Sequence, residues 1–265
     1  MADVVRDLID LTDTPSLGNR RTIFAWAMYD WANSAYTTLL ITVLAAYIQR
    51  TVFPNEQWGH TGAVVWAWGI SVSMLLGALL SPIVGAIADA HSNKRVWLAV
   101  TALGGAVSSM LLGVVPAEMY VIVVTLFVFS NLMLELSLGI YNGFLPEIAE
   151  ESQFNSASSW GYGLGYLGGG IALLLAMMLM QFGEHLGVDT TTALQWCLLL
   201  MGAWWGIFTI PALVVLRDEP TRRSDKSLSN TIRTSFSDVA ITLRGLRKNL
   251  ALALFLLSFL FYNDG

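Results

Sequence analysis

Six long apolar runs dominate this sequence and constrain its fold more than any other feature. Each holds about 20 or more predominantly apolar residues, the length that a helix needs to cross the ~30 Å hydrocarbon core of a bilayer. In lipid, a spanning segment must satisfy its backbone N–H and C=O groups within itself, so the runs predict an all-α polytopic membrane protein. The predicted spans cover residues 23–48, 63–88, 96–115, 119–141, 157–180 and 193–215.

The composition excludes several other classes of protein. Of the 265 residues, 55% are hydrophobic and 12% are charged, whereas an average soluble domain has about 25% charged residues. A disordered chain and an ordinary soluble enzyme are therefore excluded. The net charge of -5 does not favour nucleic acid, whose binding relies on clustered Lys and Arg. We also expect no metal, cofactor or catalytic residue, because the sequence holds neither metal-ligand spacing nor a phosphate loop nor a nucleophile motif.

The positive charges predict how the chain is oriented. All 14 Lys and Arg residues lie outside the predicted spans, and all but Arg50 fall in segments that would share one side of the membrane. Lys and Arg accumulate in cytoplasmic loops because they resist translocation. We therefore expect an integral protein of a bacterial inner membrane, in contact with the lipid bilayer, with its N-terminus in the cytoplasm.

The spans divide the chain into four parts. Residues 1–22 should form a cytoplasmic N-terminal segment, 23–215 a six-helix transmembrane bundle, 216–249 a cytoplasmic linker and 250–265 a truncated seventh transmembrane helix. The last run is shorter than the ~20 residues of a full span, so we expect the chain to be cut within this helix. Either a C-terminal bundle is missing, or a half-length product pairs with a second subunit.

The linker itself should contain an amphipathic helix. Apolar residues recur there at spacings of three and four, which places them on one helical stripe. A helix that lies on the membrane surface and braces two bundles is favoured over a dedicated partner-binding site. The stripe consists of Ile232, Phe236, Val239, Leu243, Leu246 and Leu250.

Two carboxylates lie inside predicted spans, where a charge at the bilayer centre costs about 2.5 to 3.5 kcal/mol. In the first span, Asp30 lies beside Tyr29 and shares a helical face with Asn33; in the fourth, Glu135 shares a face with Asn131. The two polar stripes predict a solute cavity in which either carboxylate binds a cationic group or carries a proton. The alternative is a purely structural latch between helices.

Glycines at four-residue spacing predict close contacts between helices. Gly161, Gly165 and Gly169 form two small-xxx-small steps in the fifth span, and Gly77 begins a similar series in the second. Helix packing is favoured over a backbone-lined substrate path because such spacing is common in membrane helices.

The loop after the second span carries a first family signal. Gly85, Asp89, Lys94 and Arg95 resemble the loop motif of the major facilitator superfamily, in which a glycine, an acid and trailing bases form a latch between helices. Residues 90–93 depart from that motif, so the latch could be weaker here. The resemblance implies a gating role for this loop and the N-terminal half of a major-facilitator fold.

A second resemblance covers nearly the whole chain. The blocks at 26–36, 141–149, 159–169 and 261–265 are similar to those of the family of the autophagy-related vacuolar amino-acid effluxer and its bacterial relatives. This resemblance implies outward movement of neutral amino acids. It also implies that Tyr262 and Asp264 of the seventh helix echo Tyr29 and Asp30 of the first.

These observations together predict a secondary active transporter of a small organic solute that works by alternating access. Whether Asp30 or Glu135 couples transport to protons or only binds the solute stays open. A different class stays open: a non-transporting scaffold, assembly factor or accessory subunit of a larger membrane complex. Such a scaffold should co-purify with its complex and show no solute-dependent thermal shift. A membrane-embedded enzyme is the least favoured alternative.

Overall fold

The computed structural model describes residues 17–90, 93–218, 241, 244–245 and 249–264; the side chains of residues 89–90, 259–260 and 262–264 are outside this description. Within the described ranges the chain is helical and contains no strand. The elements are α2 (Arg20–Leu39), η1 (Leu40–Leu44), α3 (Ala45–Tyr47), η2 (Ile48–Val52), α4 (Asn55–Trp58), α5 (Thr61–Ala90), α6 (Lys94–Leu112), α7 (Tyr120–Asn142), α8 (Leu145–Ile148), η3 (Glu151–Gln153), α9 (Phe154–His185), α10 (Thr190–Val215) and α12 (Leu250–Asp264).

Six helical segments among the described residues are long and apolar enough to cross a membrane, which confirms the predicted fold class. They extend somewhat beyond several of the predicted apolar runs because polar caps continue the helices outside the apolar stretch. Asn19 accepts a hydrogen bond from the backbone N–H of Arg21 at 2.9 Å, and Asp189 accepts one from Thr192 at 3.0 Å. The bonds from the Thr192 hydroxyl and N–H hold the pKa of Asp189 below its usual range.

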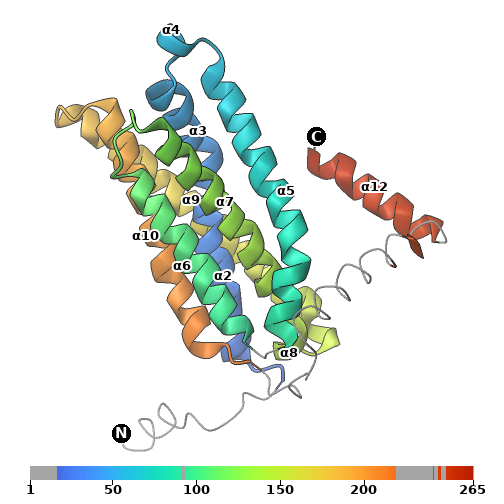
Figure 1. Ribbon diagram of the computed structural model, residues 1–265. Coiled ribbons are helices and arrows are strands. Elements are labelled where there is room, and N and C mark those ends of the chain that lie inside the picture. Colours follow the sequence, from blue (N-terminus) through green and yellow to red (C-terminus); the bar gives the residue numbers. More distant parts are fainter. Residues whose placement is uncertain (1–16, 91–92, 219–240, 242–243, 246–248, 265) are drawn as a thin grey trace, which may run out of the picture.

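The first span lies near the centre of the bundle and runs 33 residues from Arg20 to Val52. It changes to π-helical geometry twice, at η1 and at η2. Figure 1 shows α2 inside the bundle, where it packs chiefly against α9 and α10, with α5 packed on α7 and α12 standing apart from the bundle. The core therefore lies around the first span.

Small residues allow α2 and α9 to pack closely. A Cβ atom added at Gly165 would lie 2.7 Å from Ser34 Oγ, and one at Gly169 would lie 2.5 Å from Thr38 Oγ1. Such distances are shorter than van der Waals contact, so these two positions need glycine for the helices to approach as they do. This seam fixes α9 beside the polar face of α2.

Aromatic side chains fill the contact between α2 and α10. The rings of Trp31 and Trp204 stack with centroids 5.5 Å apart, and Trp204 Nε1 donates a hydrogen bond to the Trp31 carbonyl at 3.2 Å. Trp205 is fully buried and packs on Tyr36, with their ring centroids 5.0 Å apart. These contacts hold α2 in a fixed rotation about its axis, which determines where its polar face points.

Several predictions fall outside the described residues. They concern the segment 1–16, most of the linker stripe at 232, 236, 239, 243 and 246, and the side chains of Asp89, Tyr262 and Asp264.

Candidate functional site

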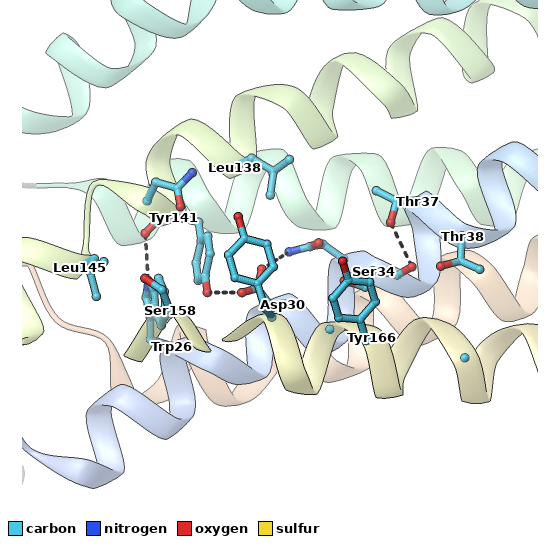
Figure 2. A pocket seen from close by; sticks show the side chains of 15 residues that line it. Trp26, Asp30, Ser34, Thr37, Thr38, Leu138, Tyr141, Leu145, Ser158 and Tyr166 are labelled. Carbon is cyan, nitrogen blue, oxygen red and sulfur yellow. Dashed lines mark hydrogen bonds between the residues drawn. The ribbon is translucent and has the colours of Figure 1, made fainter. Parts of the chain in front are cut away.

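A cavity of about 680 Å³ lies between α2, α7 and α9. Its wall combines one carboxylate with hydroxyl, amide and aromatic groups, and holds no Lys, Arg or His. Figure 2 shows these side chains converging from the three helices. The wall consists of Trp26, Asp30, Asn33, Ser34, Thr37, Thr38, Leu138, Tyr141, Asn142, Leu145, Ser158, Tyr162, Gly165, Tyr166 and Gly170.

The half-buried Asp30 is held by two donors. The Tyr141 hydroxyl donates to Asp30 Oδ2 at 2.9 Å, and Asn33 Nδ2 lies 3.4 Å from Oδ1 while also donating to the Tyr29 carbonyl at 2.9 Å. Gly161 of α9 faces the same carboxylate, and a Cβ atom there would overlap Oδ2. The missing side chain at Gly161 therefore makes the room in which the Asp30 carboxylate lies.

Tyr141 is positioned by a second residue of α2. The indole of Trp26 stacks on its ring, with centroids 4.4 Å apart and planes 12° from parallel, and Trp26 Nε1 donates to the Tyr141 carbonyl at 3.0 Å. Both side chains are almost completely buried. The stacking contact fixes the Tyr141 ring, and the hydrogen bond fixes the Tyr141 backbone carbonyl. The Tyr141 hydroxyl therefore points at Asp30 before any ligand binds.

The structure does not bring every predicted site residue to this cavity. Tyr29 is fully buried and donates to Ser137 Oγ at 2.6 Å, so it ties α2 to α7 and does not line the wall. The expectation that Tyr29 faces the cavity is corrected accordingly. Its neighbours Asp30 and Asn33, by contrast, both line the wall.

Glu135 and Asn131 also lie elsewhere, which corrects the expected pairing of the two polar stripes. Asn131 Nδ2 donates to Ser73 Oγ of α5 at 2.7 Å, and the Glu135 side chain packs on Gly77, where an added Cβ atom would lie 2.8 Å from Glu135 Cβ. Asn142 lies on the same face of α7 as Glu135, seven residues or about 10 Å further along the helix, and it does line the cavity. Glu135 is half-buried at the α5–α7 contact.

Two exposed tyrosines of α9 line the cavity and were missed by sequence reasoning. Tyr162 is 69% exposed and Tyr166 is 81% exposed. Their four-residue spacing, one position after Gly161 and Gly165, is the sequence signal that could have found them. They add two aromatic rings from α9 to the cavity wall.

The predicted gating loop forms contacts at one end of the bundle. Lys94, the first residue of α6, pairs with Glu147 of α8 at 2.5 Å and donates to the Gly143 carbonyl at 3.2 Å. The backbone N–H of Arg95 donates to Asp218 at 3.0 Å. A Cβ atom at Gly85 would meet no atom within 4 Å, so close packing does not explain that glycine. Glu147 lies outside the loop motif and was not predicted as a partner.

Among the described residues, no group of three or more His, Cys, Asp or Glu side chains is arranged so that it could hold a metal ion. The cavity offers instead a single negative charge, surrounded by hydrogen-bonding groups and aromatic faces. Such a wall suits a ligand that carries a cationic group.

Comparison with known proteins gives one family and several relatives. Residues 51–157 and 150–265 match the model of the family described as vacuole effluxer Atg22 like. The chain is 29% identical over 244 residues, 91% of its length, to the uncharacterized MFS-type transporter YxiO of Bacillus subtilis. It is 26% identical over 204 residues, 57% of its length, to autophagy-related protein 22-1 of Sclerotinia sclerotiorum, and 43% identical over 63 residues, 24% of its length, to that of Neosartorya fischeri.

The chain spans about half the length of the bacterial relative and less of the fungal ones. The matched regions cover 56%, 34% and 10% of the Bacillus, Sclerotinia and Neosartorya proteins, respectively. No solved structure matches the chain.

Proposed function

Since the chain belongs to the family of vacuole effluxers like Atg22, a family of transporters and not of enzymes, we propose that it forms one half of a secondary active transporter of a small organic solute. The observation that carries this proposal is the cavity around Asp30. A half-buried carboxylate is costly within a membrane-spanning helix, and intramembrane acids mark solute or ion paths by default.

The solute that suits this wall carries an ammonium group. Asp30 supplies the counter-charge, and the rings of Tyr162 and Tyr166 supply faces that attract a cation. The hydroxyl and amide groups of Ser34, Thr37 and Asn33 can hydrogen-bond a polar or zwitterionic solute. A neutral amino acid, which is zwitterionic, fits this chemistry, and outward movement agrees with the description of the family as vacuole effluxers.

Transport would proceed by alternating access, with this bundle rocking against a second one about the cavity. The second bundle would be either the remainder of a longer chain, with α12 as its first helix, or another subunit. At the end of the bundle where α2 begins, the contacts of Lys94 with Glu147 and Gly143 would hold α6, α7 and α8 together as one gating unit. Asp89, the acid of the predicted motif, lies in the last turn of α5 and would contribute to that gate.

Proton coupling is part of the same proposal. Asp30 is the carboxylate of the cavity wall, so a proton that neutralises it would compete with a cationic solute for the same site. Glu135, packed against α5, would act in helix contacts and not in solute binding. We further propose that the N-terminus is cytoplasmic and the host membrane is a bacterial inner membrane, as the positive charges favour.

The deciding experiment is counterflow of a labelled neutral amino acid into proteoliposomes that contain the full-length protein. We expect counterflow by the native protein and its loss with Asp30→Asn, whereas Glu135→Gln should retain it. Unchanged counterflow with Asp30→Asn would exclude the proposed role of that carboxylate. Absence of both counterflow and a thermal shift with any solute of a broad panel would favour a scaffold.

A further inference from the structure

A second cavity, of about 610 Å³, lies between the first turn of α2 and the start of α9. It differs from the Asp30 cavity in charge, because its wall carries an arginine and no carboxylate. Its polar and apolar groups come from both helices and from the end of η3. The wall includes Arg20, Ile23, Phe24, Gln153, Ser156 and Trp160.

This cavity lies on the other side of the α2–α9 seam from the Asp30 cavity. Trp160 and Tyr162 are two residues apart on α9 and therefore point about 200° apart around the helix axis. Tyr162 lines the Asp30 cavity, and Trp160 lines this one. A solute at Asp30 is thus separated from this cavity by the packed glycines of α9, and the two sites take different ligands.

The wall changes from charged to apolar with depth. Arg20 is the exposed first residue of the span, and Phe24, 55% exposed, lies four residues or about 6 Å deeper. Trp160, 63% exposed, lies six residues or about 9 Å beyond the start of α9. A cation at the membrane boundary, followed further in by apolar and aromatic side chains, matches the order of the phosphate and the acyl chain along a phospholipid.

Charge complementarity favours an anionic group beside Arg20. Among the described residues, no carboxylate forms an ion pair with Arg20. The Glu150 side chain is engaged in a capping box with the backbone N–H of Gln153. The Ser156 hydroxyl adds a donor on the α9 side of the same cavity.

We propose that this cavity binds an anionic phospholipid. Its phosphate lies against Arg20 and Ser156, and its acyl chain runs along Ile23 and Phe24 beside the Trp160 indole. With the N-terminus in the cytoplasm, the lipid belongs to the inner leaflet. The site is independent of the solute cavity, so it stands whether or not Asp30 binds a solute.

The test is native mass spectrometry of the full-length protein with phosphatidylglycerol, phosphatidylcholine or water-soluble glycerol phosphate. We expect preferential retention of phosphatidylglycerol, and about a tenfold weaker retention with Arg20→Gln, the size expected for losing one charge-assisted hydrogen bond. Arg20→Lys should retain most of the binding. Arg21→Gln is the matched control, because Arg21 is equally exposed but does not line the cavity.

Three results would overturn the proposal. Equal losses with Arg20→Gln and Arg21→Gln would mean that only the general positive charge attracts lipid. Equal retention of phosphatidylcholine would remove the preference for an anionic headgroup. Binding of glycerol phosphate as strongly as the lipid would mean that the acyl chain contributes nothing and the site takes a free phosphate compound.

Discussion

Asp30 of α2 and Tyr141 of α7 are 111 residues apart in sequence and are joined by a 2.9 Å hydrogen bond at the cavity wall. The phenol donates and the carboxylate accepts, so the bond links the two helices through the group proposed to bind the solute. Any solute that approaches Asp30 therefore meets a carboxylate whose two oxygens already accept hydrogen bonds, Oδ2 from Tyr141 and Oδ1 from Asn33.

Removing the Tyr141 hydroxyl should weaken solute binding. Tyr141→Phe keeps the ring stacked on Trp26 but deletes the donor to Asp30, and loss of a hydrogen bond to a charged group should lower affinity about tenfold. The measurement is solute affinity of the full-length protein by calorimetry. Tyr36→Phe is the control, since the buried Tyr36 hydroxyl bonds Ser130 away from the cavity. Equal effects of the two changes would contradict the prediction.

A side chain at position 161 should displace the Asp30 carboxylate. Gly161→Ala places a methyl group onto Asp30 Oδ2, and overpacking of this kind costs about 1 to 3 kcal/mol. We expect a lower melting temperature and weaker solute binding. Gly163→Ala, on the same helix with no atom within 4 Å of the added Cβ, should leave both unchanged or slightly raise stability. If Gly163→Ala is as harmful as Gly161→Ala, general helix effects explain the loss.

The Lys94–Glu147 pair should stabilise the end of the bundle at which α6 begins. The two side chains are 14% and 22% exposed, so their interaction is less screened than a surface ion pair. A double-mutant cycle with Lys94→Gln and Glu147→Gln, followed by SDS unfolding, should give a coupling of about 1 kcal/mol. Arg95→Gln should have little effect, because Asp218 accepts from the Arg95 backbone N–H. Additive effects of the two single changes would show that the pair contributes nothing.

The two intramembrane carboxylates should behave differently. Glu135→Gln alters a side chain that packs on Gly77 and does not line the cavity, so solute affinity should change less than about twofold. Asp30→Asn should lower affinity at least tenfold, because the counter-charge of the cavity is removed. Parallel isotherms of the two variants test this. A large loss with Glu135→Gln would place that residue back in the solute path.

Sequence reasoning identified the spans because the length and apolarity that a bilayer demands are local properties of each segment. It also placed Asp30 and Asn33 on the cavity wall, since residues three apart share a helical face. It misplaced Glu135 because helical periodicity shows only which residues point in the same direction from the helix axis. Which neighbour covers that face depends on contacts between helices, here Gly77 of α5 against α7.

The remaining omissions have similar physical causes. Tyr162 and Tyr166 were overlooked because each directly follows a glycine that predicts helix packing. The glycines contact α2, whereas the tyrosines, one residue further along α9, line the open cavity. The partner of Lys94 lies 53 residues away, and no spacing rule for a loop motif reaches so far.

The first span changes to π-helical geometry at η1, just after its last residues on the Asp30 cavity wall, Thr37 and Thr38. Beyond them Leu39, Leu44, Tyr47 and Ile48 are fully buried, whereas Ile41 is 68% exposed. Another cavity, of about 600 Å³, is lined by Thr42, Val43 and Ala46 of the same span. The first span therefore borders two cavities in succession along its length, and the change of helical geometry begins between them.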